Sequence, residues 1–214
     1  MADNYLEKKF EEFHSNKGGT SKHKTSSGNP SLNSLLLKNR SYRGYDSSYI
    51  VSEDELLKIV EVYTKIPSAK NQQPLRFKLV TAQDAPRLQQ YTKWAGALPE
   101  LNLPFPGTEP NAFIIICTTV DENKWVDIDL GIAAQSMLLK AVELGLNGIC
   151  IGAFNKNEVI REFDLKYEPL LVLAIGKGAE NIQLTRINEQ ESRNYYRKDG
   201  VHFVPKLGVE NILL

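Results

Sequence analysis

The sequence predicts a domain that combines helices with strands, and three segments indicate this. Residues 111–119 are almost continuously apolar and rich in β-branched side chains, as in a strand buried on both faces. Residues 127–144 carry apolar side chains at helical spacing, whereas residues 75–79 alternate apolar and charged side chains, which is typical of a half-exposed strand. The chain of 214 residues is long enough for one sizeable core or a smaller core with appendages.

The overall charge and the polar residues exclude several classes of function. Lys+Arg and Asp+Glu are both 26, so we expect no broad attraction to nucleic acid or to an anionic membrane surface. No apolar run is long enough to cross a bilayer, and the N-terminus lacks the apolar core of a signal peptide. Cys117 and Cys150 lie in apolar runs and are expected to be buried, which fits a reducing cytoplasm. The three histidines share no metal-ligand spacing, so we expect no metal.

The N-terminal part differs in composition from the rest of the chain. Residues 5–13 could form a short helix, and residues 15–34 are rich in Ser, Lys, Gly, Thr and Asn, with almost nothing to bury. We therefore expect residues 1–34 to be a short helix followed by a flexible arm, and residues 35–214 to form the folded domain.

Within the domain, the first long helix begins at a capping box formed by Ser52 and Glu55. The helix predicted at residues 127–144 has two apolar stripes, a face wider than one core contact requires. The pattern fits a central helix of one large core and a helix at a subunit interface equally well. Other helices and strands are predicted at residues 84–94 and 155–163, and at residues 146–151 and 169–175, respectively.

Two polar segments are candidates for a binding site. Pro67 and Pro74 bound a loop of uncharged donors and acceptors through which neither a helix nor a strand can continue. Such a rigid polar loop suits the edge of a heteroaromatic ring, although it also fits a plain connection between a helix and a strand. Arg40, Ser41 and Arg43 offer guanidinium and hydroxyl donors that match phosphate oxygens, although they also fit a solvated surface.

Glycines and a cationic tail supply further candidates. Gly152 follows a predicted strand and permits close approach of the backbone to a flat ligand. The tail at residues 195–206 mixes aromatic and cationic side chains, and it could equally be a surface arm. Gly176 and Gly178 also follow a strand, but the third glycine of a dinucleotide fingerprint is missing, and too little chain remains for a second βαβ unit.

The Pro-Ser-Ala-x-Asn-x-Gln-Pro pattern of residues 67–74 and the Arg-Ser-x-Arg pattern of residues 40–43 resemble the FMN-dependent nitroreductase family. The resemblance extends from about residue 35 to the C-terminus. It implies an α+β fold with a mixed central β-sheet flanked by helices, assembled as an intertwined homodimer with two FMN sites built from both chains. Asn39 stands where many members have Arg, and Leu75 where members usually have Trp.

The resemblance also implies roles for individual residues. Arg40, Ser41 and Lys206 would hold the FMN phosphate, with Arg197 as the second choice for the C-terminal cation. Arg43 would lie near the N1–O2 edge of the flavin, where it would stabilise the negative charge of the reduced ring. The complete set of expected cofactor-binding residues is Arg40, Ser41, Arg43, Pro67, Ser68, Ala69, Asn71, Gln73, Ile151, Gly152, Ala153, Arg197 and Lys206.

The implied activity is reduction of a small-molecule electron acceptor, nitroaromatic or quinone-type, by NAD(P)H through FMN in a ping-pong reaction. No catalytic acid, base or nucleophile is expected, because the flavin carries the hydride chemistry. Two alternatives remain: a flavoenzyme of the same fold with other chemistry, such as dehalogenation or flavin fragmentation, and a flavin-binding dimer without turnover.

Overall fold

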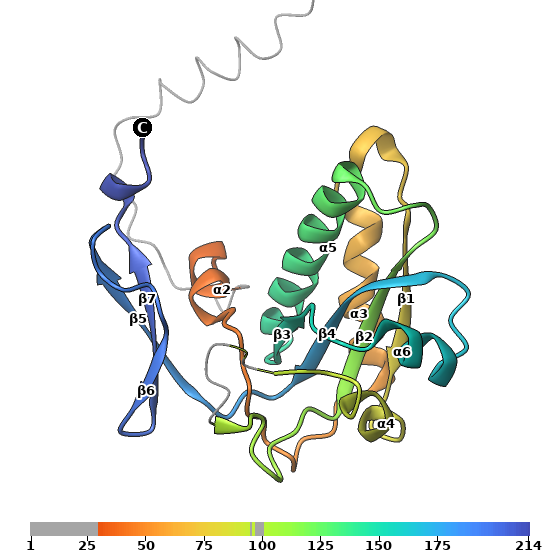
Figure 1. The fold of residues 1–214 in the computed structure, drawn as a ribbon, viewed down its shortest axis with the longest axis horizontal. Helices are drawn as coiled ribbons and strands as arrows, with labels where there is room; N and C mark the ends of the chain where they lie inside the picture. The colour runs from red at the N-terminus through yellow and green to blue at the C-terminus, as the bar shows by residue number, and fades with distance from the viewer. Residues whose placement is uncertain (1–29, 95, 97–100) are drawn as a thin grey trace, which may run out of the picture.

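A four-stranded sheet forms the centre of the computed structural model, which describes residues 30–94, 96 and 101–214 (Figure 1). The order of its strands is β1-β2-β4-β3. The helix expected at residues 5–13 and most of the expected arm lie outside the described residues. The strands are β1 (Leu75–Val80), β2 (Ala112–Thr118), β3 (Asn147–Ile151) and β4 (Glu168–Gly176).

Every strand pair in this sheet is antiparallel, so the prediction of a mixed central sheet is wrong for these four strands. The helix α5 (Lys124–Glu143) does connect two strands that run in the same direction, β2 and β3. However, β4 lies between them and pairs antiparallel with both, so this crossover produces no parallel pair. An isolated parallel bridge joins Ser41 to Gly148 on β3.

Helices cover both faces of the sheet, as predicted, and β2 is buried at every position. Ile114 and Ile116 pack in one cluster with α5 and α3 (Glu53–Glu61). Phe113 and Ile115 point to the opposite face and pack in a second cluster with α4 (Ala85–Gln89) and α6 (Lys156–Glu162). The side chains of one strand alternate between the two faces, so β2 contributes to both layers of the core.

The beginnings of the helices follow from their capping residues. The predicted capping box of α3 is present, with the Ser52 hydroxyl accepting from the Glu55 N–H and the Glu55 carboxylate accepting from the Ser52 N–H. Asn123 caps α5 by accepting from the N–H groups of Trp125 and Val126, so this helix begins three residues before the predicted start. The helix predicted at residues 84–94 is shorter than expected, because the chain turns after Gln89 and Thr92 forms a bridge to Phe154.

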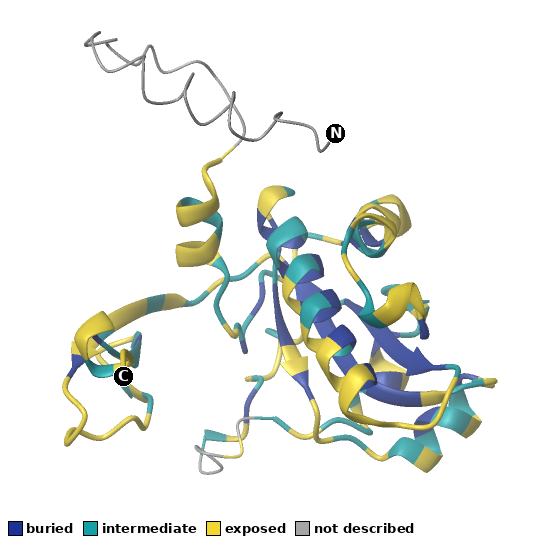
Figure 2. Ribbon diagram, turned by 90° about the horizontal axis from the view of Figure 1, so that it is seen from above, coloured by how far each residue is buried: buried dark blue, intermediate teal, exposed yellow. Residues whose placement is uncertain are grey.

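Two elements lie outside the layered core. The helix α2 (Leu32–Lys38) has no buried residue, and its first three residues fall within the expected arm. A second sheet follows β4 and stands apart from the first in Figure 1, with exposed and half-buried residues prevailing in Figure 2. Its order is β5-β7-β6, with β5 and β7 parallel. Its strands are β5 (Asn181–Ile187), β6 (Tyr196–Lys198) and β7 (Val201–Leu207), followed by η4 (Val209–Asn211).

The two cysteines differ in exposure. Cys117 is buried, as predicted, and burial raises its pKa to about 11. The prediction for Cys150 is wrong, because this residue is exposed. Cys150 pairs with Leu173 on the α5 side of the edge strand β3, whereas the neighbouring Gly148 is covered by the Leu138 side chain of α5. The side chains of α5 cover β3 at Gly148 but do not reach Cys150, two residues further along the strand.

None of the helices in the described part of the chain is both long enough and apolar enough to cross a membrane.

Candidate functional site

The polar loop between Pro67 and Pro74 is fixed to the start of α5 by a buried carboxylate. Asp129 is 2% exposed and accepts hydrogen bonds from the Ser68 hydroxyl (2.5 Å) and from the Ala69 N–H (2.8 Å). The same hydroxyl accepts from the Gln73 N–H at 2.9 Å. Ser68 thus makes its bonds within the protein and holds the loop in shape.

The backbone of this loop adopts a conformation that is uncommon for residues with a side chain. The φ angles of Lys70, Asn71 and Gln73 are 52°, 53° and 49°, all in the left-handed region. The Gln73 amide donates to the side-chain oxygen of Asn71 at 3.0 Å. Left-handed residues cost free energy and persist only where the surroundings impose them, and such residues concentrate at functional sites. The anchoring by Asp129 provides that constraint.

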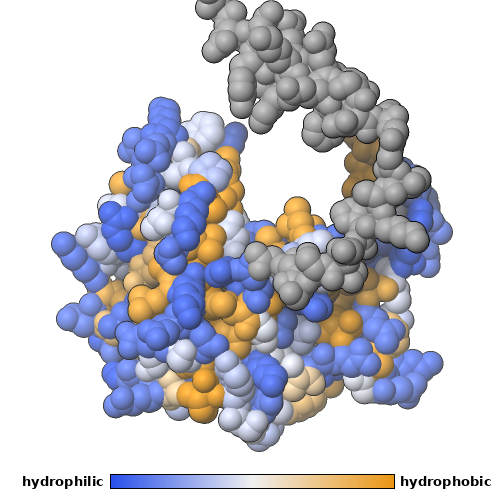
Figure 3. Space-filling model, turned by 180° about the vertical axis from the view of Figure 1, so that it is seen from behind, coloured by the Kyte–Doolittle hydropathy of each residue, from blue (hydrophilic) through white to orange (hydrophobic). Residues whose placement is uncertain are grey.

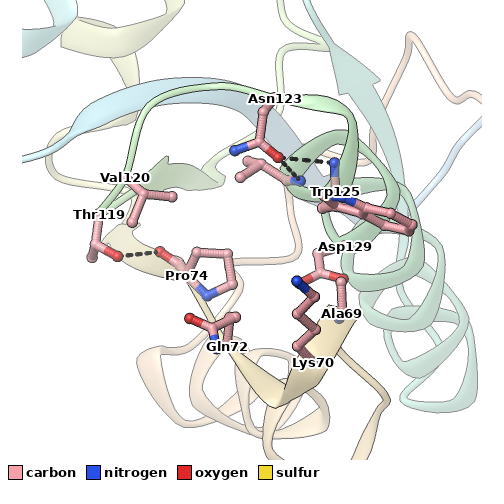
Figure 4. Close-up of a pocket in the computed structure, with 10 residues that line it drawn as sticks. Ala69, Lys70, Gln72, Pro74, Thr119, Val120, Asn123, Trp125 and Asp129 are labelled. Atoms are coloured by element: carbon pink, nitrogen blue, oxygen red, sulfur yellow. Dashed lines mark hydrogen bonds between the residues drawn. The ribbon is translucent and has the colours of Figure 1, made fainter.

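A cavity of about 470 Å³ lies beside this loop, and we call it the loop cavity (Figure 4). The Trp125 ring, 56% exposed, belongs to the first turn of α5, and Pro74 is held by bonds from the Thr119 N–H and hydroxyl to its carbonyl. Both polar and apolar groups are therefore available to a ligand. The lining residues are Ala69, Lys70, Gln72, Pro74, Thr119, Val120, Asn123, Trp125, Val126 and Asp129.

A second cavity, of about 290 Å³, gathers the predicted phosphate-binding residues, and we call it the cationic cavity. Arg40, Ser41 and Arg43 come from the segment after α2, whereas Lys206 comes from β7. These residues lie more than 150 positions apart in the sequence, yet they line one hollow, as the resemblance implied for Arg40, Ser41 and Lys206. The other lining residues are Asn39, Ile182, Tyr195, His202 and Val204.

Glu180 joins the second sheet to the segment that carries Arg43. Its buried carboxylate accepts hydrogen bonds from the N–H groups of Arg43 and Gly44 and forms a salt bridge with Arg197. Arg197 is not among the residues that line the cationic cavity, and its guanidinium is occupied by Glu180. Lys206, the first choice for the C-terminal cation, does line that cavity.

Several residues that line the cationic cavity have buried nitrogen atoms that lack a hydrogen-bond partner. Nε of Arg40, Nε of Arg43 and Nδ1 of His202 are buried and unpaired, and Nε of Arg197 beside them is unpaired too. Buried polar groups are nearly always satisfied, so these donors indicate a missing acceptor. Burial chiefly, and then the charges of Arg43 and Arg197, lower the pKa of His202 to about 4. The donor set fits a phosphate group.

The third predicted segment follows β3. The Ile151 side chain is buried in the core on the α4 and α6 side, so only its backbone could face a ligand. Gly152 has open space around the position of a Cβ atom. Ala153 lines a separate cavity of about 440 Å³ with residues 90–93, and its carbonyl accepts from the Lys93 N–H at 2.8 Å.

One chain does not bring the polar loop and the cationic cavity together. The loop is bonded to Asp129 in the N-terminal half of α5. Ser41 forms its bridge to Gly148, which lies against Leu138 in the C-terminal half of this helix, and Asn39 beside Arg40 donates to Gln135. At 1.5 Å per residue, the helix rises about 14 Å from Asp129 to Leu138. The polar loop and the cationic cavity are therefore separate within one chain, and the loop cavity and the cationic cavity share no lining residue.

Sequence reasoning missed three residues of these sites: Asp129, Glu180 and His202. Asp129 could have been found, because it lies at helical spacing with the buried residues Ala133, Met137 and Ala141, where a carboxylate requires a partner. Glu180 carried no comparable signal in the sequence. Its backbone partners Arg43 and Gly44 lie more than 130 positions away, and Arg197 lies on β6.

Comparisons with known proteins identify the family and the fold. A family model described as the nitroreductase family matches residues 36–177, which is well over half of the chain. A curated protein of Methanocaldococcus jannaschii with a nitroreductase name is 35% identical over 57 residues, a match that spans 27% of this chain and 29% of that protein.

Solved structures share the fold. A nitroreductase from Exiguobacterium sibiricum, crystallised in complex with FMN, has a TM-score of 0.58 and 20% identity, covering 73% of this chain and 92% of its own. A protein from Bacteroides thetaiotaomicron, named as an NADH dehydrogenase/NAD(P)H nitroreductase, has a TM-score of 0.57 and 21% identity, covering 72% and 90%. The layered core, the two motif-bearing segments and the family match over residues 36–177 lead to one conclusion: the chain belongs to the nitroreductase family.

Proposed function

We propose that this protein is an FMN-dependent oxidoreductase that uses NADH or NADPH to reduce a nitroaromatic or quinone-type acceptor, and that it acts as a homodimer. The family match and the names of the solved relatives support the cofactor and the electron donor. Bound FMN would supply the hydride transfer. The chain's own residues would bind the cofactor, orient it and set the electrostatic potential around it.

The observation that carries the proposal is the cationic cavity. Arg40 and Arg43 present guanidinium groups whose buried Nε atoms are unpaired, and Lys206 adds an ammonium from β7. Guanidinium groups match phosphate oxygens in geometry and in charge. Ser41 adds a hydroxyl to the same lining. This set would hold the phosphate end of FMN.

The polar loop would hold the ring end. Asn71 and Gln73 are exposed, and their amide groups contact each other at the loop surface. Their left-handed backbone is imposed by Asp129, so these donors and acceptors keep their positions before a ligand arrives. Preorganised groups bind a ligand at a lower entropic cost than mobile ones.

A second copy of the chain would complete each site. The polar loop contacts the N-terminal half of α5, whereas the segment with Arg40 and Ser41 lies nearer its C-terminal half, so a two-fold pair with antiparallel α5 helices would bring one chain's loop toward the other chain's cationic cavity. The outer face of α5 suits such contact, because Ile128 is 41% exposed and Gly131 is exposed. Apolar patches among charged residues are visible on the molecular surface in Figure 3.

Titration of the purified protein with FMN and with riboflavin tests the proposal. We expect FMN to bind and Arg40→Ala to weaken FMN binding about tenfold or more, since a charge-assisted bond contributes about 1.5–3 kcal/mol. The affinity for riboflavin, which lacks the phosphate, should change little. Arg161→Ala, at an exposed position on α6, is the matched control.

Turnover is tested by anaerobic mixing of the FMN-loaded protein with NADH or NADPH, followed by a nitroaromatic or a quinone. We expect the flavin absorbance to bleach with the nicotinamide and to return with the acceptor. A protein that does not bind FMN, or whose bound FMN stays oxidised with both nicotinamides, contradicts the proposal.

A further inference from the structure

His202 occupies an unusual position in the cationic cavity. It lies on β7, paired with Arg197 on β6 and with Ile182 on β5, and it is 3% exposed. Its imidazole contributes to the lining of the cavity, and its Nδ1 atom is buried without a hydrogen-bond partner. A buried polar atom without a partner requires an explanation in a native structure.

Most of the charged side chains around His202 are cationic. Arg43 faces it from the segment after α2, Arg197 from β6, and the cavity also receives Arg40 and Lys206. The Tyr195 ring lies 5.2 Å from the imidazole, centroid to centroid, and 4.8 Å from the guanidinium carbon of Arg43.

The nearby carboxylate does not offset this field at the imidazole. Glu180 is engaged by Arg197 and by the two backbone N–H groups of Arg43 and Gly44. Burial, Arg43 and Arg197 accordingly lower the pKa of His202 to about 4, so the imidazole is neutral near pH 7 when the cavity contains no anion.

We propose that His202 takes up a proton from solvent when a phosphate group enters the cationic cavity and then binds that phosphate as an additional cation. This inference rests on the proposed function, in which FMN supplies the phosphate. A phosphate monoester brings a charge of about −1.5 to −2 near pH 7. Such an anion makes the potential at the imidazole less positive and so stabilises its protonated form.

Linkage then fixes the sign of the pH dependence. The phosphate-bound protein holds one more proton than the empty protein at any pH between the two pKa values of His202, about 4 when empty and a raised value when occupied. The contribution of His202 to phosphate affinity should therefore fall as the pH rises from about 4 to the raised value, and should be lost above it. The phosphate itself, with a pKa near 6, loses a proton on binding at lower pH, so wild type must be compared with a variant that cannot titrate.

The experiment is titration calorimetry at about pH 6.5, in buffers of different ionisation enthalpy, which counts the protons exchanged on binding. The ligands are FMN, riboflavin and inorganic phosphate. The variants are His202→Asn, which keeps an amide at the Nδ1 position, and Lys198→Gln, which removes an exposed cation of the same hairpin and serves as the control. His202→Gln replaces the Asn variant if circular dichroism shows that the latter is unfolded.

On binding FMN, wild type and Lys198→Gln should each take up as much as one proton more than His202→Asn does. With riboflavin, the three proteins should show no such difference. Equal proton numbers in wild type and His202→Asn with FMN bound would overturn the role of His202 and leave the flavin proposal standing. His202-dependent uptake with inorganic phosphate but no binding of FMN would support the role and overturn the flavin proposal. Failure of both FMN and phosphate to bind would overturn both.

Discussion

At the scale of single residues, two buried carboxylates determine where the backbone of the candidate sites lies. Asp129 accepts from the Ala69 N–H and Glu180 accepts from the N–H groups of Arg43 and Gly44, so each carboxylate fixes a segment that belongs to no regular element. Bonds to a charged acceptor are stronger than those between neutral groups. Removing either carboxylate leaves buried donors unsatisfied.

Replacing Asp129 with Ala should reduce the free energy of unfolding by about 2–4 kcal/mol, because the Ser68 hydroxyl and the Ala69 N–H both lose a charged acceptor. Chemical denaturation followed by circular dichroism measures this change. The exposed neighbour Asp127 provides the control, and Asp127→Ala should cost less than about 1 kcal/mol. A similar effect of both substitutions would show that the loop is not held by Asp129.

His202 should make the stability of the FMN-free protein depend on pH. The unfolded chain binds a proton at His202 below about pH 6.5, whereas the folded chain does so only near pH 4, so the free energy of unfolding rises as the pH rises through this window. The expected gain is on the order of 1–3 kcal/mol. Denaturation midpoints measured across this range should be flatter for His202→Asn. Identical pH profiles would place the imidazole in contact with solvent.

At the scale of elements, the second sheet depends on its attachment to the segment after α2. Lys206 and His202 are carried by β7, so the cationic cavity is complete only while this sheet is held in place. The salt bridge links Glu180, which directly precedes β5, to Arg197 on β6, and the Glu180 carboxylate also accepts from the N–H groups of Arg43 and Gly44. This one side chain couples the position of the sheet to that of Arg43.

Glu180→Gln should loosen the second sheet without unfolding the layered core, since the neutral amide weakens both the salt bridge and the bonds to the backbone. Hydrogen exchange followed by mass spectrometry should show faster exchange in β5–β7 and unchanged exchange in β2. Glu189→Gln, at an exposed position after β5, is the matched substitution. Unchanged exchange throughout the second sheet in the Glu180 variant would contradict this coupling.

Element prediction from the sequence succeeded where a local pattern was decisive. The apolar run at residues 111–119 and the capping residue Ser52 gave a strand and a helix start that the structure confirms. The failures depend on distant contacts: β4 separates β2 from β3, and the cover over β3 ends before Cys150. For the site, side-chain chemistry suggested Arg40 and Ser41 and the family resemblance suggested Lys206, but the local pattern contained no information on which groups line one cavity.

At the scale of the whole molecule, the proposed homodimer can be tested at the outer face of α5. Ile128→Glu introduces a charge at an exposed apolar position and should shift the protein toward the monomer and reduce FMN binding at the same protein concentration. Light scattering and FMN titration measure the two effects. Leu57→Glu, at an exposed apolar position of α3, should change neither. A dimer of Ile128→Glu with normal FMN binding would exclude this face as the interface.

The separation of the polar loop from the cationic cavity along α5 has a genetic consequence for the proposed dimer. Two inactive chains, one altered only at Arg40 and the other only at Asp129, should complement each other when they are co-expressed. In a mixed pair, both alterations fall on the same cofactor site, and the remaining site is assembled from unaltered parts. Half of the sites in such heterodimers should then be functional, whereas neither parent alone recovers any.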